Sequence, residues 1–381
     1  MTRYDVAVIG AGVFGAWTAW HLAKRGQRVA LLEAYGPANA RASSAGETRI
    51  IRMGYGADEI YTHWSRNSLE QWKAFSAESN QPLFLRTGVL WLAGQDDSRL
   101  RCTEAALERS AIPFETMNRD SLAARYPQIA LDDVTTGILE PDSGVLLARR
   151  AVAAVVAKSI EHGIDFRVTQ VQAPGGSRRV DTVQSVAGEA FSAGQFVFAC
   201  GPWLPRLFPD LLGDRIFPTR QEVFFFGVPP GDSRFAPPAL PTWLFQDDQF
   251  YGMPDIEARG LKIGWDGHGE KIDPDSQSRV VSPKMTQTVR DYVARRFPAL
   301  RDAPIVETRV CQYENTSNGD LLIDRHPGFE NVWLVGGGSG HGFKHGPTIG
   351  QHVAALLLDG APIEPRFSLE SKKTVQKRTV Y

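Results

Sequence analysis

Apolar runs alternate with amphipathic stretches along the chain and predict strands and helices in turn. An apolar run at 6–9 leads into a glycine-rich turn and a helix over 13–24, and a second apolar run ends at Glu33. Charges interrupt an aromatic helical pattern over 57–79. Further apolar segments predict a helix over 145–162 that stops at Gly163, strands at 196–201, 321–324 and 332–335, and a helix that ends near Leu358.

The glycine-rich turn carries the first chemical signal. Gly10, Gly12 and Gly15 lie between a strand and a helix, where backbone N–H groups and the helix dipole face a pyrophosphate. Glu33 ends the next strand, where its carboxylate can accept hydrogen bonds from the adenosine ribose hydroxyls. Glycines alone would fit an ordinary turn, but strand, helix and acid together favour a dinucleotide site. A second glycine run, 336–342, also lets backbone approach a ligand.

Two sections have a different pattern. Short strands and loops are predicted from 82 to 141, and strand-like runs dominate from 217 to 272, including 222–226 and 261–265. We therefore expect an α/β protein of two interleaved lobes. The expected lobes are a Rossmann-like nucleotide lobe from 1–81, 144–216 and 311–381, and a substrate lobe on a mostly antiparallel sheet from 82–143 and 217–310.

Composition narrows the class of protein. The 381 residues carry a formal net charge of −1, which argues against a nucleic acid or a membrane surface as partner. Three scattered cysteines form neither a disulfide framework nor a metal-type pair, so no metal is expected. We expect Cys102 and Cys200 to be buried as small apolar side chains. The N-terminus leaves no room for a signal peptide, and no apolar segment approaches the roughly 18 residues of a membrane span, so a cytoplasmic protein is expected.

More specific motifs are spread over the whole chain. They are Thr48–Arg52 with Tyr55–Gly56, Tyr251–Pro254, Leu261–Gly264, Lys271–Asp275, Cys311–Thr316, Ile323–Asp324 and Ser339–Lys344. In residues and in order this set closely resembles the monomeric sarcosine oxidase family of FAD-dependent amine oxidases, within the D-amino-acid-oxidase-like superfamily. N-methyltryptophan oxidase, pipecolate oxidase and the fructosyl-amino-acid oxidases belong to the same group.

The resemblance implies a reaction. An FAD enzyme of this family oxidises a C–N bond of a secondary amine or N-substituted amino acid, passes a hydride to flavin N5, and is reoxidised by O₂ with release of H₂O₂. The imine then hydrolyses in water. The implied partners are a small amine or amino acid and O₂, and the implied state is a monomer. Two alternatives stay open: a dehydrogenase that passes electrons to another acceptor, and a flavin-binding protein without turnover.

Positive side chains are the implied substrate ligands. By resemblance, Arg52 and Lys344 hold the substrate carboxylate with a planar fork and a point charge. Arg49 then lies on the opposite flavin face and stabilises negative charge on the ring. The alternative for Arg52 and Lys344 is a surface or structural salt bridge, and the alternative for Arg49 is a phosphate or carboxylate contact elsewhere. In the second glycine run, Gly338 and Gly342 border the cofactor and Gly340 borders the substrate.

Lys262 is the implied oxygen-activating residue. A fixed positive charge beside the flavin lowers the barrier to O₂ reduction. Alternation along 261–264 puts Lys262 and Gly264 on one face, where we expect the glycine to leave room beside the flavin ring. A solvent-facing lysine is the alternative, because a buried ammonium group is costly.

Cys311 is the candidate for covalent attachment of FAD. A thiolate can add to the flavin 8α-methyl group when positive charge lies nearby. The resemblance favours a thioether at Cys311 over a buried, inert thiol. Tyr251 and Tyr313 then border the substrate cavity, with packed core as the alternative for each.

Two departures from the family pattern concern the substrate. Residues 43–47 replace a His-rich stretch, and Asp266 stands where the family has an active-site histidine. A carboxylate that faces the cavity favours a substrate with a second positive charge or a polyhydroxyl group. Alternatively, His268 fills the place of the histidine after a small loop shift.

Overall fold

The first β-sheet joins strands from both ends and the middle of the chain. The computed structural model describes residues 3–375 and 377. β1, β2, β9, β11 and β18 pair in parallel, whereas β10 and β17 pair antiparallel to their neighbours. The spatial order is β17 (Leu322–Arg325), β18 (Val332–Gly336), β11 (Ala190–Phe198), β1 (Arg3–Ile9), β2 (Val29–Glu33) and β9 (Asp165–Val168), with β10 (Thr182–Gln184) beside β11.

Apolar side chains cover both faces of this sheet. Along β1, Val6 and Val8 pack into one core with the helices α1 (Val13–Lys24) and α9 (Gly346–Leu358). Ala7 and Ile9 alternate with them and pack into another core, with Phe208 and Leu212. Burial on both faces explains why β2 and β18 are apolar at nearly every position.

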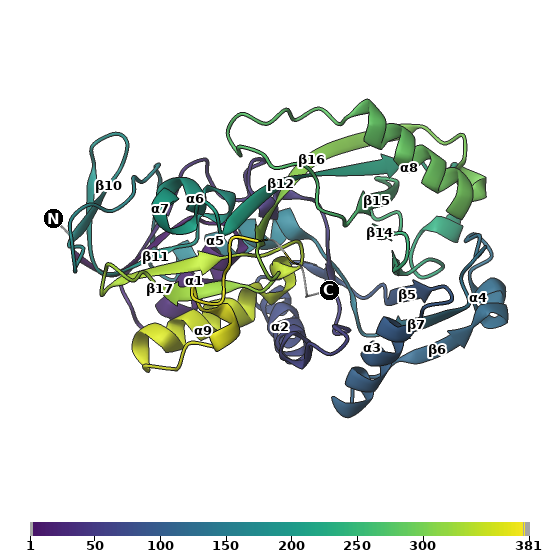
Figure 1. The fold of residues 1–381 in the computed structure, drawn as a ribbon, viewed down its shortest axis with the longest axis horizontal. Helices are drawn as coiled ribbons and strands as arrows, with labels where there is room; N and C mark the ends of the chain where they lie inside the picture. The colour runs from purple at the N-terminus through teal and green to yellow at the C-terminus, as the bar shows by residue number, and fades with distance from the viewer. Residues whose placement is uncertain (1–2, 376, 378–381) are drawn as a thin grey trace.

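The second sheet is antiparallel except where β13 pairs with β5. Figure 1 shows α8 (Pro283–Arg296) and α4 (Arg119–Arg125) beside it, at the opposite end of the molecule from β10. Its order is β16 (Ile305–Thr316), β12 (Ile216–Phe226), β15 (Leu261–Trp265), β14 (Phe250–Met253), β13 (Thr242–Phe245), β5 (Val89–Ala93), β7 (Thr136–Glu140) and β6 (Glu115–Asn118).

A third, smaller sheet and the remaining helices complete the fold. A three-stranded sheet has the order β3 (Arg49–Ile51), β8 (Gly144–Leu146) and β4 (Phe84–Leu85). No helix within the described residues combines the length and apolar composition that a membrane crossing needs. The other helices are α2 (Glu59–Glu78), α3 (Ser98–Arg109), α5 (Ala148–Glu161), α6 (Leu204–Leu207), α7 (Pro209–Leu212) and the short 3₁₀ turns Ser43–Ala45, Gly201–Trp203, Ser233–Phe235, Pro298–Leu300, Gly342–His345 and Pro365–Phe367.

The predicted α/β fold with a parallel and a mostly antiparallel sheet is confirmed, and two local predictions are wrong. The helix predicted from 145 begins at Ala148, because residues 144–146 pair as β8 with β3 and β4. The section 82–141 also contains the helices α3 and α4. The buried face of α3 is short and partly polar, with Thr103 beside Leu100, Ala106 and Leu107, so its apolar periodicity is weak. The lobe boundaries stay a prediction.

Candidate FAD and substrate site

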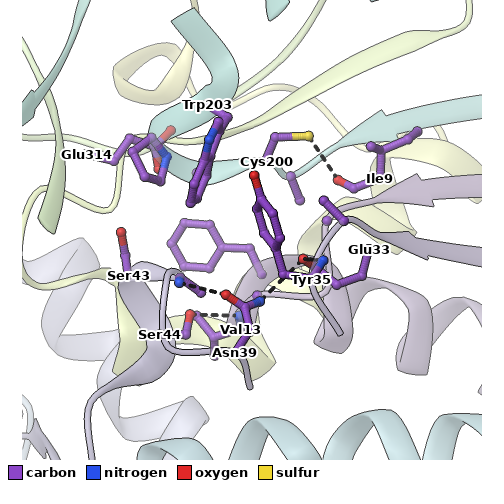
Figure 2. Close-up of a pocket in the computed structure, with 18 of the residues that line it drawn as sticks. Ile9, Val13, Glu33, Tyr35, Asn39, Ser43, Ser44, Cys200, Trp203 and Glu314 are labelled. Atoms are coloured by element: carbon purple, nitrogen blue, oxygen red, sulfur yellow. Dashed lines mark hydrogen bonds between the residues drawn. The ribbon is translucent and has the colours of Figure 1, made fainter. Parts of the chain in front are cut away.

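A cavity of about 350 Å³ lies where the parallel strands β1, β2, β11 and β18 end. Figure 2 shows its wall, with Glu33 at the end of β2, Tyr35 and Cys200 in the segments after β2 and β11, and Glu314 on β16. Ligands of open parallel sheets bind at this edge. Eight of the predicted site residues line the cavity: Gly10, Gly12, Glu33, Arg49, Tyr313, Gly338, Gly340 and Gly342.

The glycine positions leave room for a ligand backbone. Gly10 has φ +98°, and a Cβ there would lie 2.4 Å from the carbonyl oxygen of Ala199, so the turn requires glycine. Gly12 and Gly338 also line the cavity, and a Cβ at either would be in ordinary contact with a neighbouring side chain at 3.5 Å. Gly15 does not line the cavity; it packs against the Gly10 carbonyl and shapes the turn. The space and the turn fit a dinucleotide pyrophosphate.

Glu33 is held at the cavity wall by the protein's own donors. Its carboxylate accepts hydrogen bonds from the backbone N–H of Ala11 (2.7 Å) and Tyr35 (3.1 Å) and from Asn39 Nδ2 (3.3 Å). Burial raises the pKa of Glu33, and the backbone donors oppose that rise. A fixed acceptor beside the glycine turn fits an adenosine ribose.

An acidic residue links two aromatic rings of the cavity lining. Asp275 Oδ1 accepts hydrogen bonds from Trp203 Nε1 (2.8 Å) and from the Tyr35 hydroxyl (3.3 Å), and Arg206 pairs with the other oxygen. The two ring centroids lie 5.9 Å apart. All four side chains line the cavity, so Asp275 connects its own loop to the segments that carry Tyr35 and Trp203–Arg206. These four residues are called the Asp275 clasp. Sequence reasoning missed this clasp, although Asp275 lies inside one of the quoted motifs.

Arg49 brings positive charge to Cys311. Its Nη2 donates to the carbonyl of Ser43 (2.8 Å) and lies 3.4 Å from the Cys311 sulfur, while Nη1 donates to the Thr48 carbonyl (2.9 Å). Arg49 lines the cavity, whereas Cys311 contacts Arg49 but is not among the residues that line the cavity. The structure therefore provides the cation that a reactive thiolate needs.

The other two cysteines differ from the expectation of buried thiols. Cys102 is exposed on α3, because it lies on the helix face opposite Leu100 and Thr103, so the prediction for it is wrong. Cys200 is half-buried and lines the cavity, with its sulfur donating to the Ile9 carbonyl (3.4 Å). Burial raises the pKa of the Cys200 thiol well above its usual range, and Glu33 and Glu314 raise it further.

Two tyrosines and Asp266 form one hydrogen-bonded group beside the cavity. The Tyr313 hydroxyl donates to Asp266 Oδ1 (3.1 Å), and its ring packs against Gly340. Burial raises the pKa of Tyr251 to about 12. The space beside Gly264 is filled by the Tyr251 ring, which a Cβ there would approach to 2.7 Å, so the expectation that this glycine leaves room for the flavin is wrong. His268 is half-buried in the loop that follows β15.

Arg52 and Lys344 converge on one residue, Tyr55. The Arg52 guanidinium lies 4.3 Å from the centre of the Tyr55 ring, and Lys344 Nζ donates to the Tyr55 hydroxyl (2.9 Å). Arg52 and Lys344 are 7% and 4% exposed, so neither is part of a surface salt bridge. His341 Nδ1 and His345 Nε2 lie 3.1 and 2.9 Å from the same hydroxyl.

The pKa of His345 favours a neutral imidazole ring in this group. Burial lowers its pKa well below the usual range, and the charges of Lys344, His341 and Arg52 lower it further.

Sequence reasoning assigned no role to Tyr55, His341 or His345, although the first two lie in quoted motifs. Neither Arg52 nor Lys344 is part of the lining of the large cavity.

Lys262 is buried, at 3% exposure, which excludes the alternative of a solvent-facing lysine. Its Nζ donates to the carbonyl (2.8 Å) and the hydroxyl (3.0 Å) of Thr48, the neighbour of Arg49. Burial lowers the pKa of Lys262 well below its usual range, and the like charge of Arg49 lowers it further. Lys262 lines a second cavity of about 30 Å³ and not the large one.

Comparisons with known proteins agree with this geometry. The FAD dependent oxidoreductase family matches residues 5–356. Monomeric sarcosine oxidase from Bacillus sp. (strain B-0618) is 30% identical, over 100% of both chains, and peroxisomal sarcosine oxidase from Mus musculus is 31% identical over 97% of each. Among solved structures, L-proline dehydrogenase from P. horikoshii superposes with a TM-score of 0.83 at 22% identity, covering 96% of this chain and 97% of that one.

These matches span nearly the whole chain, and the glycine turns, the acceptor at Glu33 and the cavity between them fit the cofactor that the family name specifies. Within the described residues no group of three or more His, Cys, Asp and Glu side chains is arranged to hold a metal ion. The chain belongs to the FAD-dependent oxidoreductases, with the monomeric sarcosine oxidases among its relatives.

Proposed function

We propose that the chain oxidises the C–N bond of an N-substituted amino acid, of the sarcosine, pipecolate or fructosyl-amino-acid type. One observation carries this proposal: the buried cations of Arg52 and Lys344 share Tyr55. The positive charge of Arg52, removed from water, requires a compensating anion. Arg52 makes no ion pair with a carboxylate of the described residues, so the carboxylate of a substrate is a suitable partner.

Each side chain has a defined task in this proposal. Bound FAD supplies the acceptor for the two electrons of the C–N bond. Arg52 and Lys344 fix the substrate carboxylate and thereby the position of Cα and nitrogen. Tyr313 borders the substrate, and Asp266, which accepts the Tyr313 hydrogen bond, favours a substrate that carries a further positive charge or hydroxyl groups.

We further propose that O₂ is the final electron acceptor and that Cys311 carries the FAD. Lys262 and Arg49 supply positive charge on either side of Thr48, which supports reaction with O₂. The contact between Arg49 and the Cys311 sulfur supports a thioether. The monomeric state and the cytoplasmic location stay predictions.

An anaerobic screen tests the proposed substrate class. Purified protein is mixed without O₂ with N-methyl, cyclic, opine-like and glycated amino acids, each beside its amine analogue that lacks the carboxylate. Bleaching of flavin absorbance by the amino acids but not by the analogues is expected. Bleaching by the analogues alone would contradict the carboxylate contact, and no bleaching by any amine would leave a flavin protein without turnover. Oxygen consumption with the active substrate then separates an oxidase from a dehydrogenase.

A further inference from the structure

The Tyr55 hydroxyl lies at the centre of a buried hydrogen-bond group whose hydrogens can be assigned. It accepts a hydrogen bond from Lys344 Nζ (2.9 Å) and lies within hydrogen-bond distance of His341 Nδ1 and His345 Nε2. All four side chains are buried. A hydroxyl group donates one hydrogen bond and accepts two, which matches these three contacts. One histidine must therefore accept from Tyr55, and the other must donate to it.

The carbonyl of Gly319 decides which histidine accepts. It lies 3.0 Å from His341 Nε2, and a carbonyl oxygen can only accept, so this ring nitrogen carries a hydrogen. In a neutral ring His341 Nδ1 is then bare, and it accepts the hydrogen of the Tyr55 hydroxyl. His345 accordingly donates to Tyr55 from Nε2.

The reverse arrangement carries two costs at once. His341 would have to be doubly protonated, which adds a third buried cation to Lys344 and Arg52 around Tyr55. His345 would carry its hydrogen on Nδ1, which is shielded from solvent and has no hydrogen-bond partner among the described residues. Folded proteins avoid an orphaned buried N–H group more strictly than an unused acceptor.

We infer that His341 and His345 are positioning residues for substrate binding. As neutral rings with a hydrogen on Nε2, they direct the Tyr55 hydrogen away from Lys344, and a lone pair of Tyr55 holds the Lys344 ammonium group. A second acceptor of that group, the His341 carbonyl (2.9 Å), is also uncharged. Neutral acceptors fix the position of Lys344 and, unlike a carboxylate, do not cancel its charge. The inference rests on the proposed function, in which Lys344 contacts the substrate carboxylate.

The first test reads the ring hydrogens directly in the FAD-loaded chain. The protein is labelled with ¹⁵N at its eight histidines, and long-range ¹H–¹⁵N correlation spectra at pH 7 distinguish a protonated from a bare ring nitrogen. Signals are assigned by their loss in His341→Asn and in His345→Gln. Both rings should carry a hydrogen on Nε2 alone. A hydrogen on Nδ1 of His345, or on both nitrogens of His341, would overturn the inference.

A double-mutant cycle separates positioning through Tyr55 from a structural role of the His345 ring. Anaerobic reduction of the flavin by sarcosine, followed against sarcosine concentration, gives Kd. His345→Leu should raise this Kd about fivefold and Tyr55→Phe about tenfold. The double variant should match Tyr55→Phe alone, because His345 acts through the hydroxyl. His345→Gln, whose amide reaches as far as Nε2 and can donate, should stay near the parent value.

Additive effects in the cycle, or equal losses in His345→Gln and His345→Leu, would overturn the inference. His352→Leu, at a half-buried histidine of α9, is the matched control and should leave Kd unchanged. The spectra need no substrate. The opposite ring hydrogens together with normal sarcosine oxidation would therefore overturn this inference alone. The expected ring hydrogens without flavin reduction by any amino acid would contradict the proposed function and leave the assignment of the hydrogens intact.

Discussion

The ammonium group of Lys262 lies in buried surroundings that disfavour its positive charge. It is buried near the Arg49 guanidinium, and it donates hydrogen bonds to the carbonyl and hydroxyl oxygens of Thr48. Such a position stores electrostatic free energy that a nearby developing anion releases. The residue is therefore expected to affect one half of the catalytic cycle and not the other.

Lys262→Met should slow the reaction of reduced flavin with O₂ by roughly 3–4 kcal/mol, or about 100- to 1,000-fold. Anaerobic reduction by substrate should change far less. Stopped-flow absorbance follows both half-reactions. Equal damage to both would indicate a disordered pocket, and unchanged reoxidation would exclude this role for Lys262.

The same charge predicts a pH dependence. The folded pKa of Lys262 is depressed, so the ammonium form is complete at low pH and is lost as pH rises through that depressed value. The rate of reoxidation should fall in step, at a pH below the ordinary range of a lysine. Lys262→Met should show no such fall between pH 6 and pH 10 when the two proteins are compared by stopped flow.

Removal of either cation beside Tyr55 should weaken substrate binding and turnover. Arg52→Ala or Lys344→Ala should lower kcat/KM for carboxylate substrates by roughly 2–4 kcal/mol, or about 30- to 1,000-fold. Tyr55→Phe removes only the hydroxyl that accepts from Lys344 and should cost about tenfold. Arg101→Ala, at an exposed arginine on α3, is the control. Near-normal kcat/KM in both charge variants would mean that the substrate is not an anionic amino acid.

A thioether between Cys311 and FAD would keep the cofactor attached to denatured protein. Denatured protein should stay yellow after acid precipitation, with a mass that exceeds the chain by one FAD, because a thioether survives denaturation. Cys311→Ser should release the pigment into the supernatant, whereas Cys102→Ser, at the exposed cysteine, should not. Free FAD in the supernatant of the unmodified protein would disprove the attachment.

The ends of the parallel strands carry much of the cofactor site. The cavity is lined where β1, β2, β11 and β18 stop, and Asp275 joins the segments after β2 and β11. Loops gain their precision here from hydrogen bonds between segments far apart in sequence. Loss of one such contact should loosen the site without unfolding the sheets.

Asp275→Asn keeps the size of the side chain and removes the charge that faces Arg206. We expect faster FAD dissociation, by several-fold, in the Cys311→Ser background, with little change in melting temperature of the cofactor-free protein. Recovery of FAD fluorescence on dilution measures the rate. Asp210→Asn, at an exposed acid on α7, should leave the rate unchanged; an equal acceleration in both variants would contradict a specific clasp.

At the scale of the whole molecule, the sequence predicted motifs that are short in sequence, but it did not predict which distant residues come into contact. The first strand, the glycine turn and Glu33 all lie between residues 6 and 33, so the local sequence pattern alone located them. Lys344 and Tyr55 lie 289 residues apart, and only the folded chain brings them together. Alternation correctly put Lys262 and Gly264 on one face, yet it carried no information on Tyr251, the cross-strand partner of Gly264. Cys311 was suggested by family resemblance, and its contact with Arg49 needed the structure.

The cavity joins both sheets, which makes the cofactor a mechanical crosslink. Gly10 and Gly12 follow β1 and Glu33 ends β2 of the first sheet, whereas Gln312, Tyr313 and Glu314 lie on β16 of the second. A hinge that swung the sheets apart would break contacts to the bound molecule at one end. We therefore expect substrate and product to exchange through movements of loops. The two sheets should keep their relative positions around FAD throughout turnover.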